Sequence, residues 1–166
     1  IAAGHFPKFI PMIGTSIGMI KPANILVVGT GVVGLQAIAT GKRLGGVVKA
    51  VDIRPDARKE AESLGVKVVG FEAPPELVIG RGGYAKALPD EWLEKEHQAL
   101  APLVADADII VLSALVPGEV AQTLITREMV ETMKPGSVIV DVSIDQGGNC
   151  ELTDPGKERM HKGVYI

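Results

Sequence analysis

Three glycines with the spacing G-x-G-x-x-G follow a short apolar run near the start of the chain. The run is residues 25–28, and the glycines are Gly29, Gly31 and Gly34. In this pattern the first glycine permits a tight turn, the second lets a pyrophosphate approach the backbone, and the third lets a helix pack closely on the strand. The unpaired N–H groups and the dipole at a helix N-terminus also favour a diphosphate. The motif therefore predicts a dinucleotide site, with a glycine-rich turn that binds nothing as the structural alternative.

A carboxylate stands at the end of the next apolar run. Asp52 follows residues 47–51 and lies close to the ~20-residue spacing of the acid that binds ribose hydroxyls in dinucleotide sites. A carboxylate there accepts hydrogen bonds from both hydroxyls and repels a 2′-phosphate, so it favours NAD(H) over NADP(H). Arg54 leaves two alternatives open, because it could pair with a 2′-phosphate or stack on the adenine ring.

Two later loops are expected to face the same crevice. They are residues 114–118 and 145–149, which follow apolar runs, and loops at the carboxyl ends of strands form the ligand crevice of open α/β sheets. Leu115 is a candidate apolar wall for one half of a dinucleotide, while a simple turn at Pro117 fits the spacing equally well. Asp145 is either a structural turn residue or a charge near the nicotinamide.

The elements that position these residues alternate between short apolar strands and helices. Strands are predicted at 25–28, 47–51, 66–69, 108–112, 137–142 and 163–166. Helices are predicted at 33–44, 57–64, 90–104 and 126–133. Near-continuous apolar strands separated by helices are typical of a parallel sheet covered on both faces. The predicted fold class is therefore α/β, a Rossmann-type doubly wound parallel sheet of about six strands with helices on both faces.

One connection is unusually long. Residues 72–88 are rich in glycine and proline, and a loop of that length inside a compact domain is usually functional or mobile. The helix after it carries Glu91, Lys95 and Glu96, which are predicted to form a solvated face. Alternatively, Glu96 could reach a ligand if the long loop folds over it.

Composition excludes several classes of protein. The 166 residues include 20 glycines, are 46% hydrophobic and carry a net charge of −3, which argues against a disordered chain and gives no electrostatic reason to expect nucleic acid. One cysteine rules out an intramolecular disulfide, and the three histidines lack the spacing of metal ligands, so no metal site is expected. The apolar stretch 6–20 is too short and too often interrupted to insert into a membrane.

Several longer strings resemble one family, the NAD(H)-binding component of proton-translocating NAD(P) transhydrogenase, which is the first domain of its alpha subunit and a relative of alanine dehydrogenase. The strings are GTGVVGLQAIAT at 29–40, KRLG at 42–45, DIR at 52–54, GGYAK at 82–86, ALVPG at 114–118, LIT at 124–126, MKPGS at 133–137 and GGNC at 147–150. The sequence IDQGG at 144–148 is closer to alanine dehydrogenase, where the matching aspartate is implicated near the nicotinamide. The resemblance covers nearly the whole chain.

The resemblance implies a set of residues and a division of the chain. The residues expected at the nucleotide, from the motif and the resemblance together, are Gly29, Gly31, Val32, Val33, Gly34, Asp52, Ile53, Arg54, Gly83, Tyr84, Glu96, Ala114 and Leu115. Asp145 is the candidate catalytic residue, and GGYAK is expected to be a mobile lid over the nucleotide. Residues 1–22 are expected to be the end of the helix that connects this domain to a companion half-domain, with a lead-in, and residues 23–166 the NAD-binding domain.

The resemblance also implies an activity and partners. Hydride passes between NAD(H) on this component and NADP(H) on another, coupled to proton movement through a membrane subunit. The expected cofactor is NAD, and the expected partners are the NADP(H)-binding subunit, the membrane subunit and a second copy of the chain. The expected location is the cytoplasm, peripheral to the inner membrane, or the matrix side in mitochondria. The alternatives are the NAD-binding domain of an alanine dehydrogenase, which deaminates alanine oxidatively, and a non-catalytic NAD-binding module that senses redox state.

Overall fold

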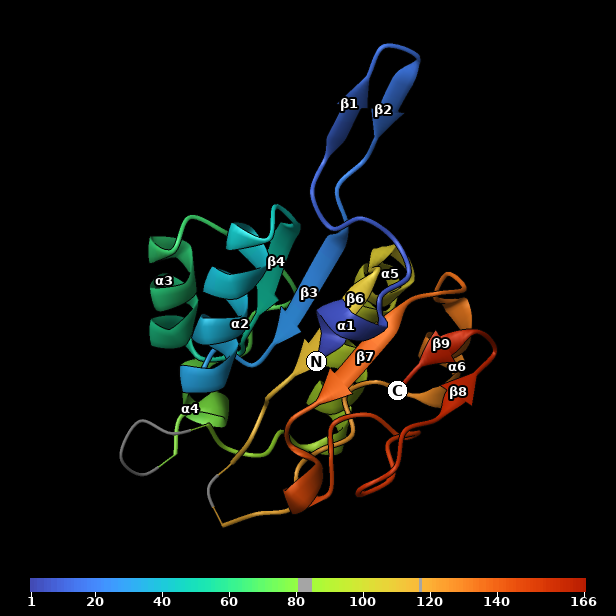
Figure 1. Ribbon diagram of the computed structural model, residues 1–166. Coiled ribbons are helices and arrows are strands. Elements are labelled where there is room, and N and C mark those ends of the chain that lie inside the picture. The colour runs from blue at the N-terminus through green and yellow to red at the C-terminus, as the bar shows by residue number, and fades with distance from the viewer. Residues whose placement is uncertain (81–84, 117) are drawn as a thin grey trace.

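The computed structural model describes residues 1–80, 85–116 and 118–166. In this part of the chain, seven strands form one sheet in the order β5-β4-β3-β6-β7-β9-β8 (Figure 1). The strands are β3 (Asn24–Val28), β4 (Val47–Val51), β5 (Lys67–Val68), β6 (Ile109–Leu112), β7 (Val138–Asp141), β8 (Met160–His161) and β9 (Val164–Tyr165). Every neighbouring pair from β5 to β9 is parallel, and the edge strand β8 is antiparallel to β9. The six predicted strands are all present, and β8 is an additional one.

Helices cover both faces of the sheet. They are α1 (Ala2–His5), α2 (Val32–Arg43), α3 (Pro55–Ser63), α4 (Pro75–Val78), α5 (Asp90–Asp106) and α6 (Arg127–Thr132). Because successive strand residues point to opposite faces, Val27 of β3 packs in the cluster that contains Ile38 of α2, whereas Val28 packs in the cluster that contains Leu100 of α5. Two separate cores, one on each face, confirm the doubly wound α/β fold.

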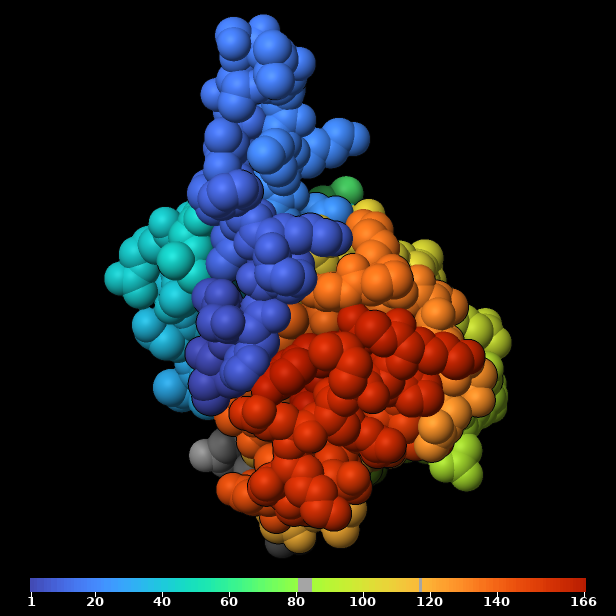
Figure 2. All heavy atoms as spheres, turned by 45° about the vertical axis from the view of Figure 1, so that its right-hand side comes forward, coloured from blue at the N-terminus to red at the C-terminus, as the bar shows by residue number. Residues whose placement is uncertain are grey.

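The first 22 residues comprise one short helix and a hairpin. Only α1 is helical, and a two-stranded hairpin of β1 (Ile13–Thr15) and β2 (Gly18–Ile20) follows it. Phe6 and Ile10 anchor this segment in the core on the α2 face, but the hairpin itself projects from the body as an arm (Figures 1 and 2). The sequence did not predict the hairpin because three-residue strands around an exposed turn leave little apolar periodicity.

The segment predicted as a long loop at 72–88 has structure of its own. Pro75 opens the short helix α4, where its missing N–H has no cost, and Ile79 pairs with Ala85 in an antiparallel bridge. Val78 and Leu88 are buried in a small cluster against α5. The sequence did not predict this short helix and bridge, because two prolines and a few apolar residues suffice for one packed turn.

No helix among the described residues combines the length and the apolarity that crossing a membrane requires.

Candidate functional site

A cavity of about 470 Å³ opens at the carboxyl ends of the central strands. It lies where the strand order reverses, between β3 and β6, which is where ligands bind in open α/β sheets. Its lining includes ten of the residues that the sequence proposed for the nucleotide. They are Gly29, Gly31, Val32, Val33, Asp52, Ile53, Arg54, Glu96, Ala114 and Leu115.

The three glycines of the motif have distinct surroundings. Gly29 has a φ of +87°, and a Cβ there would lie 2.6 Å from the backbone nitrogen of Ala114. A Cβ on Gly34 would lie 1.9 Å from the carbonyl oxygen of Gly29, so helix α2 can approach the turn only without a side chain. A Cβ on Gly31 would meet no described atom within 4 Å. Packing therefore explains Gly29 and Gly34, whereas the space at Gly31 belongs to the cavity.

The first turn of α2 presents backbone donors to this space. Gly31 is the N-cap residue and supplies no side-chain cap, so the first N–H groups of the helix lack the usual intrahelical partners. Val32 and Val33 are both exposed there. The turn thus combines free N–H groups, the positive end of a twelve-residue helix and an open approach.

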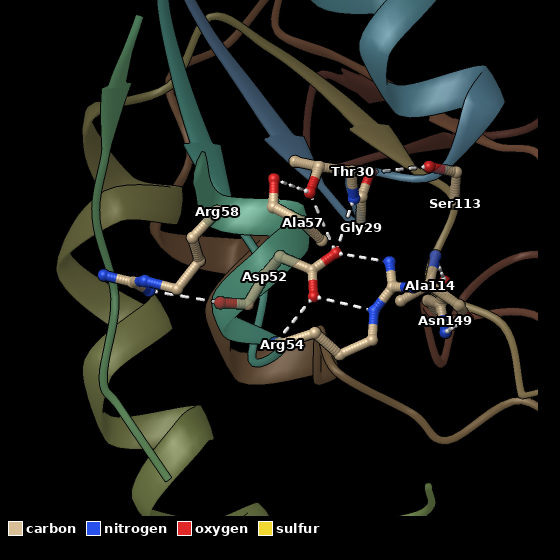
Figure 3. A network of polar contacts seen from close by, with 9 residues as sticks. All are labelled: Gly29, Thr30, Asp52, Arg54, Ala57, Arg58, Ser113, Ala114 and Asn149. Carbon is tan, nitrogen blue, oxygen red and sulfur yellow. Dashed lines mark hydrogen bonds and ion pairs between the residues drawn. The ribbon is translucent and has the colours of Figure 1, made fainter. Parts of the chain in front are cut away.

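Asp52 lies at the end of β4, 6% exposed, at the centre of a hydrogen-bond network (Figure 3). Its Oδ2 accepts hydrogen bonds from Thr30 N at 2.8 Å and from Thr30 Oγ1 at 3.0 Å. The carbonyl oxygen of Ala57, 3.1 Å from Thr30 Oγ1, is a second acceptor for the single hydroxyl hydrogen, so Thr30 lies between Asp52 and the start of α3. The sequence did not predict a role for Thr30, since only the position of Asp52 beside the turn makes its hydroxyl useful.

Arg54 pairs with Asp52 in this structure, and the two positions left open by the sequence, at a 2′-phosphate or over the adenine, stay predictions. Its Nε lies 3.2 Å from Oδ1 of Asp52, its Nη2 lies 3.0 Å from Oδ2, and its backbone N–H donates to Oδ1 at 2.9 Å. This two-pronged contact covers both carboxylate oxygens, as is typical of an arginine–carboxylate pair. The Asp52 carboxylate is therefore fully engaged by protein donors in this conformation.

Glu96 lies on the buried face of α5, in contrast to the predicted solvated face. It is 4% exposed and precedes Leu100 and Val104, both fully buried, by one and two helical turns. Burial, and to a smaller extent the negative charge of Asp52, raise the pKa of Glu96 from 4.5 to about 7. Glu91 and Lys95 do form the expected exposed pair, with their charged atoms 2.9 Å apart.

Asn149 holds the two crevice loops together through side-chain hydrogen bonds. Its Nδ2 donates to the carbonyl oxygens of Ala114 at 3.0 Å and Gln122 at 2.9 Å, while its Oδ1 accepts from Ala114 N at 3.0 Å and Ser143 Oγ at 2.7 Å. Both amide hydrogens and both lone pairs are thus used. Asp141 of β7 in turn accepts the backbone N–H of Asn149 at 2.7 Å. These contacts fix the loop that brings Ala114 and Leu115 to the cavity, and sequence reasoning did not identify them.

The remaining predicted residues lie elsewhere. Gly34 is buried beneath the turn and does not line the cavity. Asp145 is exposed on the 3-10 turn η2 (Ile144–Gln146) and is not part of the lining either. Gly83, Tyr84 and Pro117, and with them most of the proposed lid, lie outside the described residues.

The whole chain, residues 1–166, matches the family described as "Alanine dehydrogenase/PNT, C-terminal domain". The chain belongs to this family. The resemblance inferred from the sequence strings is thereby confirmed.

Individual relatives agree with this assignment. The chain is 45% identical over 165 residues to the first part of the NAD(P) transhydrogenase subunit alpha of Rhodospirillum rubrum, covering 99% of this chain and 43% of that protein. Alanine dehydrogenase of Bacillus subtilis is 34% identical over 135 residues, covering 81% of this chain and 30% of the enzyme. The crystal structure of transhydrogenase from Sinorhizobium meliloti superimposes with a TM-score of 0.80 at 39% identity, over 99% of this chain and 42% of that one. The chain thus spans less than half the length of these relatives.

Proposed function

We propose that this chain is the NAD(H)-binding domain of a proton-translocating NAD(P) transhydrogenase. The observation that carries the proposal is the cavity at the strand-order reversal, where the glycine turn, the N-terminus of α2 and the buried carboxylate of Asp52 meet. The open space at Gly31 fits a pyrophosphate, because a Cβ there would occupy the cavity rather than contact protein. Higher identity to a transhydrogenase subunit than to alanine dehydrogenase favours the former.

In this proposal the protein binds and orients, and does no acid–base chemistry at the reacting carbon. The bound nucleotide supplies a hydride donor or acceptor. The N–H groups of Val32 and Val33 would donate hydrogen bonds to the pyrophosphate. Asp52 would accept hydrogen bonds from the ribose hydroxyls, and Leu115 would supply an apolar wall. Ribose binding at Asp52 requires Arg54 to release at least one of its side-chain contacts, since both oxygens are occupied. Asp145 carries no step, because it does not line the cavity.

Replacing Asp52 by alanine should weaken NADH binding by about 1–3 kcal/mol, the range for losing charged hydrogen bonds. Isothermal titration calorimetry with NADH and NADPH measures the loss, and the wild-type protein should bind NADH the more tightly because Asp52 repels a 2′-phosphate. Asp56→Ala, which removes an exposed carboxylate at the start of α3, should leave the affinity unchanged. Tighter binding of NADPH than of NADH by the wild-type protein would overturn the assignment of Asp52.

The activity of the complete assembly follows from the same proposal. We place NADP(H) on a partner subunit and proton movement in a membrane subunit, with this chain peripheral to the inner membrane through those partners. Hydride exchange between NADH and an NADP⁺ analogue, measured with the full-length subunit and its NADP(H)-binding partner, tests the proposal directly. Oxidation of alanine by the full-length subunit would instead support the alanine dehydrogenase alternative, and binding without either reaction would support a redox sensor.

The hairpin β1–β2 supports a homodimer. Ile17 is 97% exposed and Met19 67% exposed, and an isolated two-stranded hairpin in water is only marginally stable. The double variant Ile17→Glu/Met19→Glu should therefore weaken self-association at least tenfold in sedimentation equilibrium. Met160→Glu, an exposed change on the edge strand β8, should leave it intact. If the double variant self-associates as tightly as Met160→Glu, the dimer interface lies away from the hairpin.

A further inference from the structure

Glu96 is a buried carboxyl group on the wall of the cavity. Its spacing from Leu100 and Val104 puts it on the face of α5 that packs against the sheet, one turn nearer the cavity than the core residues. Among the described residues none forms a hydrogen bond or an ion pair with its side chain, although it is 96% buried. No fully buried side-chain oxygen of the described residues lacks a hydrogen-bond partner, so the carboxyl oxygens of Glu96 are open to the cavity that the residue lines, where a ligand can reach them.

Among the charged side chains near Glu96, Asp52 is the one that disfavours its ionised form. The other titratable side chains of the described cavity lining are Asp52 at the end of β4, Arg54 and Glu60 from the α3 region, and Lys86. Arg54 is already paired with Asp52, and Lys86 and Glu60 are exposed. Strand β3, on which α5 packs, contributes Val28 and backbone at Gly29, and α6 contributes no described residue to the lining.

We propose that Glu96 binds the nucleotide as a neutral carboxylic acid that donates a hydrogen bond, so that nucleotide binding is coupled to protonation of Glu96. This inference rests on the proposed function. A neutral carboxyl group has an O–H donor as well as an acceptor, whereas the carboxylate has acceptors only. Filling the cavity also removes water from Glu96, which further favours the neutral form. Above neutral pH, the proton comes from solvent and one is taken up for each nucleotide bound.

The coupling predicts a specific pH dependence of affinity. Burial and Asp52 raise the pKa of Glu96 to about 7 in the free site, and only the protonated fraction is competent to bind. Because the apparent dissociation constant rises as that fraction falls, NADH affinity should be constant below pH 6 and about tenfold weaker at pH 8. Calorimetry at pH 8 in two buffers with different ionisation enthalpies should show the uptake of close to one proton per NADH.

Two matched variants separate this coupling from other titrations. Glu96→Gln keeps a donor without a titratable proton, so its affinity should not change between pH 6 and pH 8 and its proton uptake should vanish. Glu91→Gln makes the same change on the exposed side of the same helix and should keep the wild-type profile. Wild-type affinity that is flat with pH, or uptake of no proton, would overturn the coupling even if Glu96→Gln does not fold. Absence of NADH binding at every pH would instead overturn the proposed function.

Discussion

Gly34→Ala should lower the free energy of unfolding by at least about 3 kcal/mol, at the upper end of the cost of overpacking. The added Cβ would lie 1.9 Å from the carbonyl oxygen of Gly29, and this oxygen cannot move aside easily. It accepts a hydrogen bond from Ser113 Oγ at 2.9 Å, while the N–H of Gly29 donates to the carbonyl oxygen of Val51, also at 2.9 Å. Relief of the clash must therefore pull α2 away from β3. Urea denaturation followed by circular dichroism measures the loss.

Gly31→Ala is the matched control. Its Cβ would meet no described protein atom within 4 Å, so the expected change in stability is below about 1 kcal/mol, the cost of alanine instead of glycine at an N-cap. The same Cβ points into the proposed pyrophosphate site, so NADH binding should weaken although the protein stays folded. Equal destabilisation by Gly31→Ala and Gly34→Ala would refute the distinction between a ligand-facing and a packing glycine.

The parts of the site that depend on local chain geometry could be predicted from the sequence. A strand followed by G-x-G-x-x-G has few conformations available, because Gly29 needs a positive φ and Gly34 must lack a side chain. The position of Asp52 follows from the same regularity, since parallel neighbours place consecutive strand ends at one edge of the sheet. These positions are set by the residue's own strand or turn, whereas the hairpin β1–β2 and helix α4, although local, have too weak a sequence pattern to be predicted.

The parts that depend on side chains from distant segments could not be predicted. Asn149 is placed by partners 27 and 35 positions away, and the contact of Arg54 with Asp52 depends on which of several reachable acceptors lies within the folded site. Glu96 is an intermediate case. Its spacing from Leu100 and Val104 is that of a buried helical face, but the adjacent charges at Glu91 and Lys95 suggested solvent, and sequence alone gives no reason to bury a carboxyl group without a partner.

Burial of Glu96 should make the stability of the nucleotide-free protein fall as pH rises. The pKa is about 7 in the folded protein and 4.5 as an ordinary value, so between these pH values the folded state holds a proton that the unfolded state has lost. Stability is then unaffected below pH 4.5, decreases through this window, and shows the full penalty above pH 7. A difference of this size corresponds to about 3 kcal/mol.

The measurement is a comparison of wild type and Glu96→Gln without nucleotide. Because glutamine does not titrate, the variant should gain about 3 kcal/mol of unfolding free energy relative to wild type between pH 4.5 and pH 8, as determined by urea denaturation at each pH. Using the difference between the two proteins cancels the other titrating groups. Parallel pH profiles would mean that Glu96 is solvated in the free protein. Ionising its carboxyl group would then cost no stability, and nucleotide binding would not be coupled to its protonation. If the difference in unfolding free energy between the two proteins grows as pH rises, the ionised Glu96 destabilises the nucleotide-free protein at neutral pH. A nucleotide that keeps Glu96 protonated can remove this destabilisation.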